Sequence, residues 1–112
     1  MVSRRLPGAP VSFERFVRRE LRRLHRVDHC DPGAIGIGVN CLRTDGFARG
    51  GVSDCGGYVA IWKQVDGRWR QIIGTQDIWT CRELRPFEVP SAGVGPHAQC
   101  ARGRSEVAYH HR

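Results

Sequence analysis

The sequence predicts an α+β domain in which one N-terminal amphipathic helix packs on an antiparallel β-meander of three to four strands. First, apolar side chains recur at helical spacing between residues 13 and 27. Second, residues 34–43 alternate between two faces, as a half-buried strand does. Third, Asp66-Gly67 separates two runs of strand-forming residues, which is the strongest short-range signal for a hairpin. A chain of 112 residues builds one core, so residues 12–112 are expected to form a single domain.

The first element follows a short basic arm, residues 1–11, which is expected to be flexible. Ser12 is a suitable N-cap for a helix running from Phe13 to about Val27. Its apolar face contains Phe13, Phe16, Val17, Leu21, Leu24 and Val27. The opposite face contains Arg15, Arg18, Arg19, Arg22, Arg23 and Arg26. We therefore expect one face to pack on the sheet and the other to contact solvent.

A strand follows at residues 34–43, after Asp31-Pro32-Gly33 has ended the helical region. On this strand one face is expected to contain Ile35, Ile37, Val39 and Cys41. Residues 44–47 read as a turn. Residues 48–57 are interpreted as a glycine-rich connection with at most a short second strand.

The hairpin consists of residues 58–65 and 68–75. A regular two-residue turn would pair Val65 with Arg68, Ile61 with Ile72 and Ala60 with Ile73. One face would then hold Val59, Ile61 and Ile72, and the other Tyr58, Ala60, Trp62, Trp69 and Ile73. In the tail, residues 76–84 favour a helical turn, residues 92–103 a loop and residues 106–109 a last short strand.

The charge balance favours an anionic partner. The net charge is +7, and 17 of the 18 basic residues are arginine, with Lys63 the exception. Guanidinium groups bind phosphate and carboxylate in a fixed, bidentate geometry, although GC-rich codon usage also produces an arginine excess. No apolar run approaches the roughly 20 residues that a transmembrane helix needs. We expect the partner to be a protein or another macromolecule, with weak, nonspecific nucleic-acid binding.

The five cysteines lack any CxxC pair, which disfavours zinc ribbons and thioredoxin-like motifs. Cys30, Cys55, Cys81 and Cys100 lie at element ends, where bridges form. Our hypothesis is that Cys30 pairs with Cys55 and Cys81 with Cys100, leaving Cys41 as a buried thiol. This cysteine pattern favours a secreted or extracellular protein. The segment after Met1 has no apolar stretch typical of a signal peptide, which favours the cytoplasm, and the compartment stays open.

Two surfaces are candidates for binding. The first is the arginine face of the helix, which would hold phosphates. The alternative is that it is simply a solvent-exposed outer face. The second is the face of the hairpin that carries Tyr58, Trp62 and Trp69, suited to stacking. The alternative there is that the tail after Cys81 covers these rings and makes a second small core.

Two smaller groups of residues are also candidates. Glu20 falls inside the apolar arc of the helix, where a general base would need a pocket; the alternative is an ion pair with Arg43 or Arg70. His25, His29 and Cys30 are spaced so that they could ligate a metal, or they simply end the helix, where imidazolium favours the dipole. His110 and His111 are interpreted as a solvated tail. Phosphate-binding, nucleophile-elbow and zinc-protease motifs are missing, and no cofactor is expected.

The order of elements over residues 12–80, one helix leading into an antiparallel meander, resembles the cystatin-like and nuclear-transport-factor-2-like α+β rolls. The resemblance implies a helix packed across a curled sheet. It implies no activity, because such folds include enzymes, inhibitors and binding domains. The sequence therefore predicts a non-enzymatic binding or interaction module. The runner-up is a nucleic-acid-binding protein using phosphate contacts, and third is a small hydrolase or isomerase with a pocket between helix and sheet.

Overall fold

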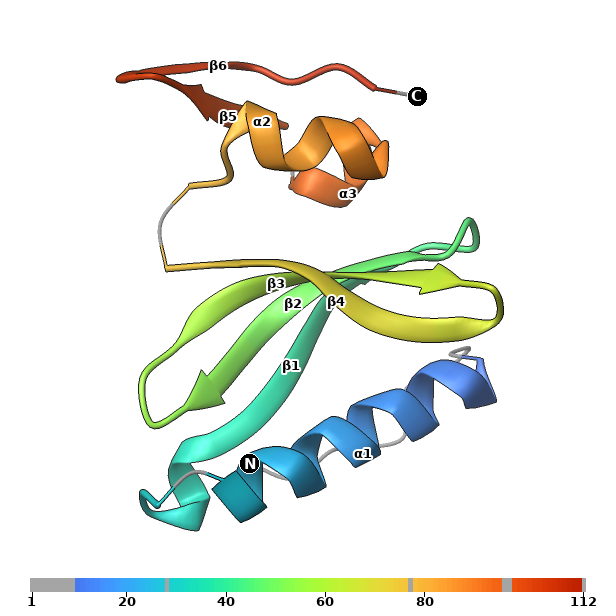
Figure 1. The fold of residues 1–112 in the computed structure, drawn as a ribbon, viewed down its shortest axis with the longest axis vertical. Coiled ribbons are helices and arrows are strands. Elements are labelled where there is room, and N and C mark those ends of the chain that lie inside the picture. Colours follow the sequence, from blue (N-terminus) through green and yellow to red (C-terminus); the bar gives the residue numbers. More distant parts are fainter. Residues whose placement is uncertain (1–9, 28, 77, 96–97, 112) are drawn as a thin grey trace.

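A four-stranded antiparallel sheet lies between a long helix and a compact C-terminal segment (Figure 1). The computed structural model describes residues 10–27, 29–76, 78–95 and 98–111. The first half comprises α1 (Val11–Val27), β1 (Ile35–Leu42), β2 (Phe47–Asp54), β3 (Tyr58–Val65) and β4 (Arg68–Thr75). The second comprises α2 (Cys81–Leu84), α3 (Ser91–Val94), β5 (Gln99–Arg102) and β6 (Ser105–Ala108). Two 3₁₀ turns complete it, η1 (Pro32–Ala34) and η2 (Arg85–Phe87). The predicted α+β class, with one N-terminal helix followed by a meander, is confirmed.

Helix α1 begins two residues earlier than predicted. The carbonyl of Pro10 accepts hydrogen bonds from the backbone N–H groups of Phe13 and Glu14, at 3.0 and 3.1 Å. The prediction of Ser12 as N-cap is therefore wrong. Ser12 lies in the first turn, where its hydroxyl accepts a hydrogen bond from the indole of Trp69 at 3.2 Å. Of the predicted arm, residues 1–9 lie outside the described residues, and Val11 belongs to the helix.

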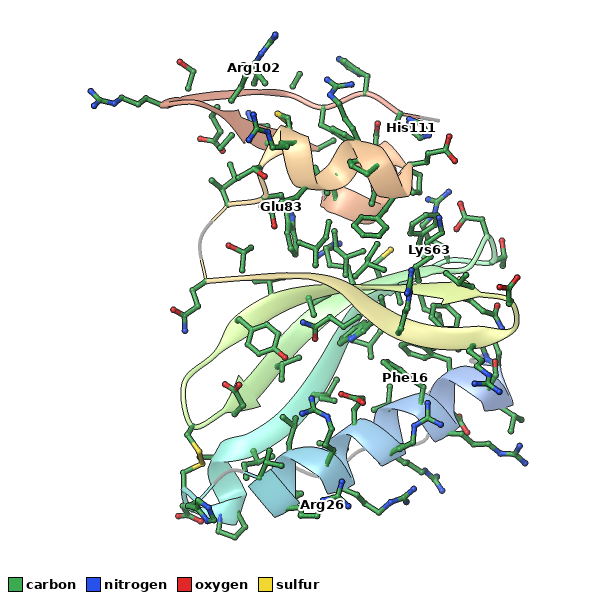
Figure 2. The ribbon with its side chains drawn as sticks, viewed as in Figure 1. Phe16, Arg26, Lys63, Glu83, Arg102 and His111 are labelled. Atoms are coloured by element: carbon green, nitrogen blue, oxygen red, sulfur yellow. A yellow bond between two sulfur atoms is a disulfide. The ribbon has the colours of Figure 1, made fainter. Side chains whose placement is uncertain are left out.

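The apolar face of α1 packs on the sheet. Its buried side chains are Phe13, Phe16, Val17, Leu21 and Leu24. In Figure 2, Phe16 lies between the helix and the sheet, and Arg26 lies on the far side of the helix. Val27 departs from the prediction, because it is the last helical residue, lies beyond the core contacts and is 50% exposed.

Strand β2 corrects the expected loop at residues 48–57. It is eight residues long and pairs with β1 on one side and β3 on the other, in the sheet order β1-β2-β3-β4. Of its two glycines, Gly50 is required by close packing, whereas Gly51 borders open space. A Cβ at Gly50 would collide with the carbonyl oxygen of Gly38 and come within 3.0 Å of the Trp62 ring. Glycine at this position therefore allows β1 and β2 to approach beneath the indole.

Two β-bulges change which side chains share a face. Asn40 is the extra residue in β1, because Val39 pairs with Gly50 and Cys41 with Arg49. Ile35, Ile37 and Val39 share a face as predicted, but Cys41 is turned to the opposite face. A bulge reverses alternation in this way because it inserts one residue into a period of two.

The second bulge lies in the hairpin. The turn at Asp66-Gly67 pairs Val65 with Arg68 as predicted, and both turn residues have positive φ, as a two-residue hairpin requires. The extra residue is Ile72, so Ile61 pairs with Ile73 and Ala60 with Gly74. The predicted pairs Ile61–Ile72 and Ala60–Ile73 are wrong. Ile73 consequently shares the face of Ile61 rather than that of Trp62.

The two faces of the sheet carry separate cores. Beneath α1, the rings of Phe13, Phe16, Trp62 and Trp69 form edge-to-face and tilted contacts with centroid distances of 4.7 to 6.4 Å. The opposite face is covered by the C-terminal half, with the second core built on Phe47, Ile61, Ile73, Trp79, Leu84, Val89, Val94, Cys100 and Tyr109. The helix thus covers the aromatic face, and the tail covers the aliphatic one.

The C-terminal half is built from short elements rather than the loop predicted at residues 92–103. The hydroxyl of Thr80 caps α2 by accepting from the Glu83 backbone N–H, and the Glu83 carboxylate accepts in return from the Thr80 N–H. This half includes α3 and the β5–β6 hairpin, of which β6 matches the predicted last strand to within a residue at each end. The predicted helical turn at residues 76–84 is confirmed in its second half by α2.

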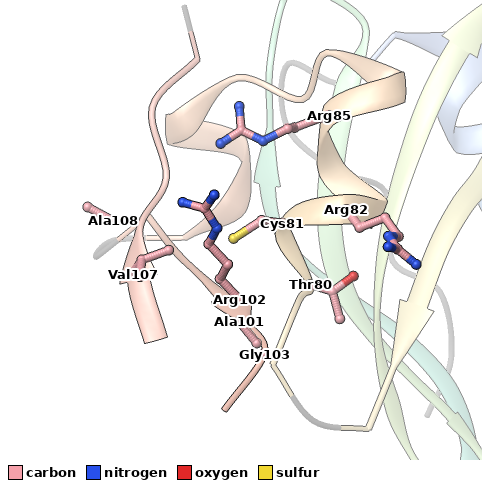
Figure 3. Close-up of a pocket in the computed structure, with 9 residues that line it drawn as sticks. All are labelled: Thr80, Cys81, Arg82, Arg85, Ala101, Arg102, Gly103, Val107 and Ala108. Atoms are coloured by element: carbon pink, nitrogen blue, oxygen red, sulfur yellow. The ribbon is translucent and has the colours of Figure 1, made fainter. Parts of the chain in front are cut away.

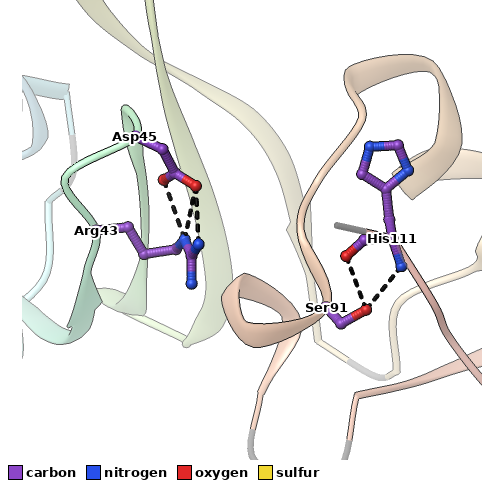
Figure 4. A network of polar contacts seen from close by, with 4 residues as sticks. All are labelled: Arg43, Asp45, Ser91 and His111. Atoms are coloured by element: carbon purple, nitrogen blue, oxygen red, sulfur yellow. Dashed lines mark hydrogen bonds and ion pairs between the residues drawn. The ribbon is translucent and has the colours of Figure 1, made fainter.

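Polar contacts join the second half to the sheet and hold its end in place. Arg49 and Lys63, from β2 and β3, donate to the carbonyls of Gly93 and Phe87 at 3.2 and 3.1 Å. At the chain end, the backbone N–H and carbonyl of His111 both bond the Ser91 hydroxyl, at 2.7 and 3.0 Å (Figure 4). The imidazoles of His110 and His111 are exposed, as expected, although the backbone of His111 is hydrogen-bonded to Ser91.

Both predicted disulfides are present. Cys30–Cys55 joins the segment after α1 to the β2–β3 turn, and Cys81–Cys100 joins α2 to β5. Cys41 is the free cysteine, and it is half-buried rather than buried. The bridges close 25- and 19-residue separations, and loops of this length stabilise a fold by about 3 kcal/mol each.

Candidate anion-binding surfaces

The outer face of α1 carries the six predicted arginines, and all six are exposed: Arg15, Arg18, Arg19, Arg22, Arg23 and Arg26. They project from one regular helix whose other side is fixed to the sheet by five buried side chains. Only Glu14 and Glu20 are acidic within α1. The face therefore combines a high density of positive charge with a rigid support.

Two of these arginines make contacts within the helix. Arg23 forms an ion pair with Glu20 at 2.9 Å, one turn away. The guanidinium of Arg19 lies 6.0 Å from the centroid of the Phe16 ring. Surface pairs at this spacing contribute only about 0.2–0.5 kcal/mol, so they leave the arginines available for stronger partners. The described ion pairs do not involve Arg15, Arg18, Arg22 or Arg26.

The predicted aromatic binding face is not a surface. Trp62 is 1% and Trp69 5% exposed, and both indoles lie under α1. The expectation that they stack on a partner is wrong for this structure, because the helix already occupies that side of the sheet. The alternative was a cover formed by the tail, and this too is wrong in its detail, since α1 provides the cover.

Tyr58 is the one member of that trio at the rim of the sheet. It is half-buried, and its hydroxyl donates to the side-chain oxygen of Gln71 at 3.1 Å. Burial raises the pKa of its phenol, with Asp54 adding to the shift and the hydrogen bond to Gln71 opposing it. The phenol is therefore a neutral hydrogen-bonding group at physiological pH, beside shallow hollows at this end of the sheet.

Glu20 is half-buried at the edge of the helix–sheet interface, and its side chain is 23% exposed. Its partner is Arg23 on the same helix rather than Arg43 or Arg70 as predicted. Arg43 instead holds Asp45 through two nitrogens, and this hydrogen bond raises the pKa of its guanidinium (Figure 4). None of the described pockets is lined by Glu20, and the space between α1 and the sheet is filled by the first core.

The residues predicted as metal ligands are not brought together. Cys30 is consumed in the bridge to Cys55, so its sulfur is no longer a thiolate ligand. His25 is exposed in the last turn of α1, whereas His29 lies beyond the helix, which ends at Val27. Within the described part of the chain, no three His, Cys, Asp or Glu side chains gather in a way that would hold a metal ion.

A second arginine cluster was missed by the sequence analysis. It surrounds a pocket of about 780 Å³ between α2 and the β5–β6 hairpin, at the opposite end of the molecule from α1. Arg82 and Arg85 come from one wall and Arg102 from the other (Figure 3). Arg102 is 17 or more positions from the other two in the sequence and shares no period with them, so only the paired cysteines beside them, Cys81 and Cys100, offered a signal.

No known protein family, curated protein or solved structure matches this chain. The likeness to cystatin-like and nuclear-transport-factor-2-like rolls thus stays at the level of element order, and no residue role is transferred from it. Among the described residues, the structure shows no helix with the length and apolar character needed to cross a membrane.

Proposed function

We propose that this protein is a non-enzymatic binding module that holds the phosphate backbone of a nucleic acid on the arginine face of α1. The observation that supports this is the exposure of all six arginines on one helix whose apolar side is anchored in the core. Burial of Trp62 and Trp69 favours it over the stacking mode, since the competing surface is covered. The two disulfides are compatible with an extracellular protein, and we propose an oxidising compartment.

The dimensions of the strip suit a polyanion. Arg15 and Arg26 are eleven residues apart, which is about 16 Å along a helix. Duplex DNA carries a negative charge about every 1.7 Å of its axis, so a segment of this length has roughly ten phosphates, of which those on the near side can contact the strip. Binding releases condensed counterions, which makes it favourable at low salt and weak at physiological salt. Sequence preference is not expected, because phosphate contacts position a protein without reading bases.

The test is a salt titration of binding to a fluorescent DNA duplex, followed by anisotropy. For the unmodified protein, log affinity should fall linearly with log salt, with a slope near −0.9 per phosphate contact. The double variant R18E/R22E should bind at least about tenfold more weakly and have a shallower slope by about two contacts. Both positions are exposed and lie outside the described ion pairs, so helicity by circular dichroism should be unchanged.

The matched control is R68E/R70E, which makes the same charge change on β4. Both of these arginines are also exposed. A loss of affinity confined to the α1 variant supports the proposal. Equal losses in both variants would mean that net charge alone attracts the DNA. Salt-insensitive binding to an acidic protein, with no DNA binding at any salt, would replace the nucleic acid by a protein partner.

A further inference from the structure

The pocket beside Cys81–Cys100 has two walls that are joined covalently. One wall is α2 and η2, and the other is the strand β5 with the turn that follows it. The disulfide connects the first residue of α2 to the second residue of β5. The walls are also joined by a parallel bridge between Thr80 and Ala101, next to a 2.7 Å hydrogen bond from the Ala101 N–H to the Trp79 carbonyl.

Two guanidinium groups converge between these walls. In Figure 3, the side chains of Arg85 and Arg102 extend from opposite walls toward the same space over the sulfur of Cys81, while Arg82 extends to the other side of α2. Each lies one to four residues from a bridged cysteine in the chain, so the bridge sets the separation of the two arginine-bearing walls. The bridge therefore fixes the backbone positions from which the two exposed arginines extend, which lowers part of the entropic cost of binding.

No carboxylate lines this pocket among the described residues. Two acids flank the lining residues in the chain. Glu83 is occupied by the Thr80 hydroxyl at 2.7 Å and by the Thr80 N–H, and Glu106 lies on the hairpin face opposite to Arg102. Arg82, Arg85 and Arg102 take part in none of the described ion pairs. Like charges brought together without a counterion repel, and an anion placed between them removes that repulsion while accepting bidentate hydrogen bonds.

Part of the remaining lining is apolar. Val107 lies on the same face of the β5–β6 hairpin as Arg102 and is half-buried. The volume of about 780 Å³ is within the range of small-molecule sites and is far larger than one bare anion requires. A ligand that fits both features has an anionic group for the arginines and an apolar body for Val107.

We propose that this pocket is a binding site for a phosphomonoester, with Arg85 and Arg102 holding the phosphate and Val107 contacting its organic group. A dianionic phosphate suits two converging guanidinium forks better than a single carboxylate, because it offers three acceptor oxygens and twice the charge. The site goes beyond the proposed role of α1, which lies on the other side of the sheet.

The experiment is a titration of the oxidised protein with phenyl phosphate, followed by amide chemical shifts in NMR spectra. Shifts are expected in residues 80–85 and 99–108, with affinity greater than that of inorganic phosphate, since the ring contacts the apolar wall. Benzoate keeps the ring and replaces the phosphate by a carboxylate, and it should bind more weakly than phenyl phosphate. R85Q and R102Q should each reduce affinity about tenfold or more, as the loss of a charged hydrogen-bonding partner does.

Two matched variants control for bulk charge and for the other surface. R70Q removes an exposed arginine from β4 and should leave phenyl phosphate binding unchanged. R18E/R22E should also leave it unchanged, so this site and the α1 surface can fail independently. Equal weakening by R70Q and R85Q would overturn the proposal, as would equal affinity for phenyl phosphate and benzoate, or shifts located on α1.

Discussion

The two halves of this molecule are stabilised in different ways. Up to Thr75 the helix and all four strands have eight or more residues each, and the core between α1 and the sheet is centred on an aromatic cluster. After Thr75 the elements have three or four residues each, and order comes from specific contacts. These are a disulfide, a capping box and the buried hydroxyl of Tyr109, which donates to the Val89 carbonyl. The first half, which also has the bridge Cys30–Cys55, relies mainly on long regular elements. The second half relies on specific contacts between short elements and on the second core.

The difference also separates the two arginine surfaces. On α1 the arginines are arranged by helical period, so losing one contact elsewhere leaves the strip in place. At the pocket, Arg85 and Arg102 are arranged by a cross-link between two very short elements. We expect binding at the pocket to depend on local stability, and binding at α1 to depend only on global folding.

The largest expected effect is a loss of stability on substitution in the sheet that both halves pack against. Trp62→Ala should reduce the free energy of unfolding by about 3–5 kcal/mol, because it removes a 1% exposed indole from the centre of the first core. Chemical denaturation measures this. Val11→Ala, at a 60% exposed position of α1 outside the core, should change stability by less than about 0.5 kcal/mol. If Trp62→Ala had an equally small effect, the indole would not be a core residue, and the expected role of Trp62 in stacking on a partner would again be possible.

The second effect tests the cross-link directly. C81A/C100A should cost about 3 kcal/mol and should increase amide hydrogen exchange in residues 79–109 more than in α1 and β1–β3. C30A/C55A is the matched control, with a similar loop length but a location beside α1. It should speed exchange near residues 29–35 and 54–58 instead. Identical exchange patterns for the two variants would show that the halves do not differ as described.

The smallest effect appears at alkaline pH. Burial raises the pKa of Tyr109 above its model-compound value of 10.0, with Arg85 opposing the shift, and burial likewise raises the pKa of Tyr58. The unfolded chain therefore loses these protons first. Stability from this source is complete below about pH 10 and is lost as pH rises through the folded-state pKa values.

Stability measured against pH should show this decline, and phenolate absorbance should place both tyrosine titrations above pH 10. Tyr109→Phe should remove part of the pH dependence. At neutral pH it should cost about 1–3 kcal/mol, because the Val89 carbonyl loses its donor. A tyrosine titrating at or below its ordinary pKa in the folded protein would contradict the burial of its hydroxyl.

The parts of the fold that could be predicted from sequence are those with a local period or a local turn. Helix α1 and the Asp66-Gly67 hairpin follow from the spacing of apolar residues and from turn chemistry. Both bulges escaped, because no residue type requires them and each shifts the pairing by one position. Strand β2 was not predicted because Gly50 and Gly51 indicate a loop, whereas Gly50 is needed for a close approach to Gly38 and Trp62 that only the fold shows.

The candidate sites divide in the same way. The arginine face of α1 is a property of one helix, so its composition could be predicted and its exposure follows from packing. The pocket depends on which elements of the C-terminal half pack together, and Arg85 and Arg102 line the same pocket only because of that packing. The aromatic face was misassigned because periodicity shows which residues share a face but not which neighbour covers it.

The placement of the bulges has a consequence for how the chain behaves when it is crowded. Both extra residues, Asn40 and Ile72, lie in the outer strands β1 and β4 rather than in the inner pair. An outer strand has a row of unsatisfied backbone groups that can recruit the edge of another molecule, and a bulge interrupts that row and increases its twist. Arg68 and Arg70 add exposed charge to β4. The sheet is thus poorly shaped for edge-to-edge pairing with other molecules and growth into fibrils, although its outer strands are each eight residues long.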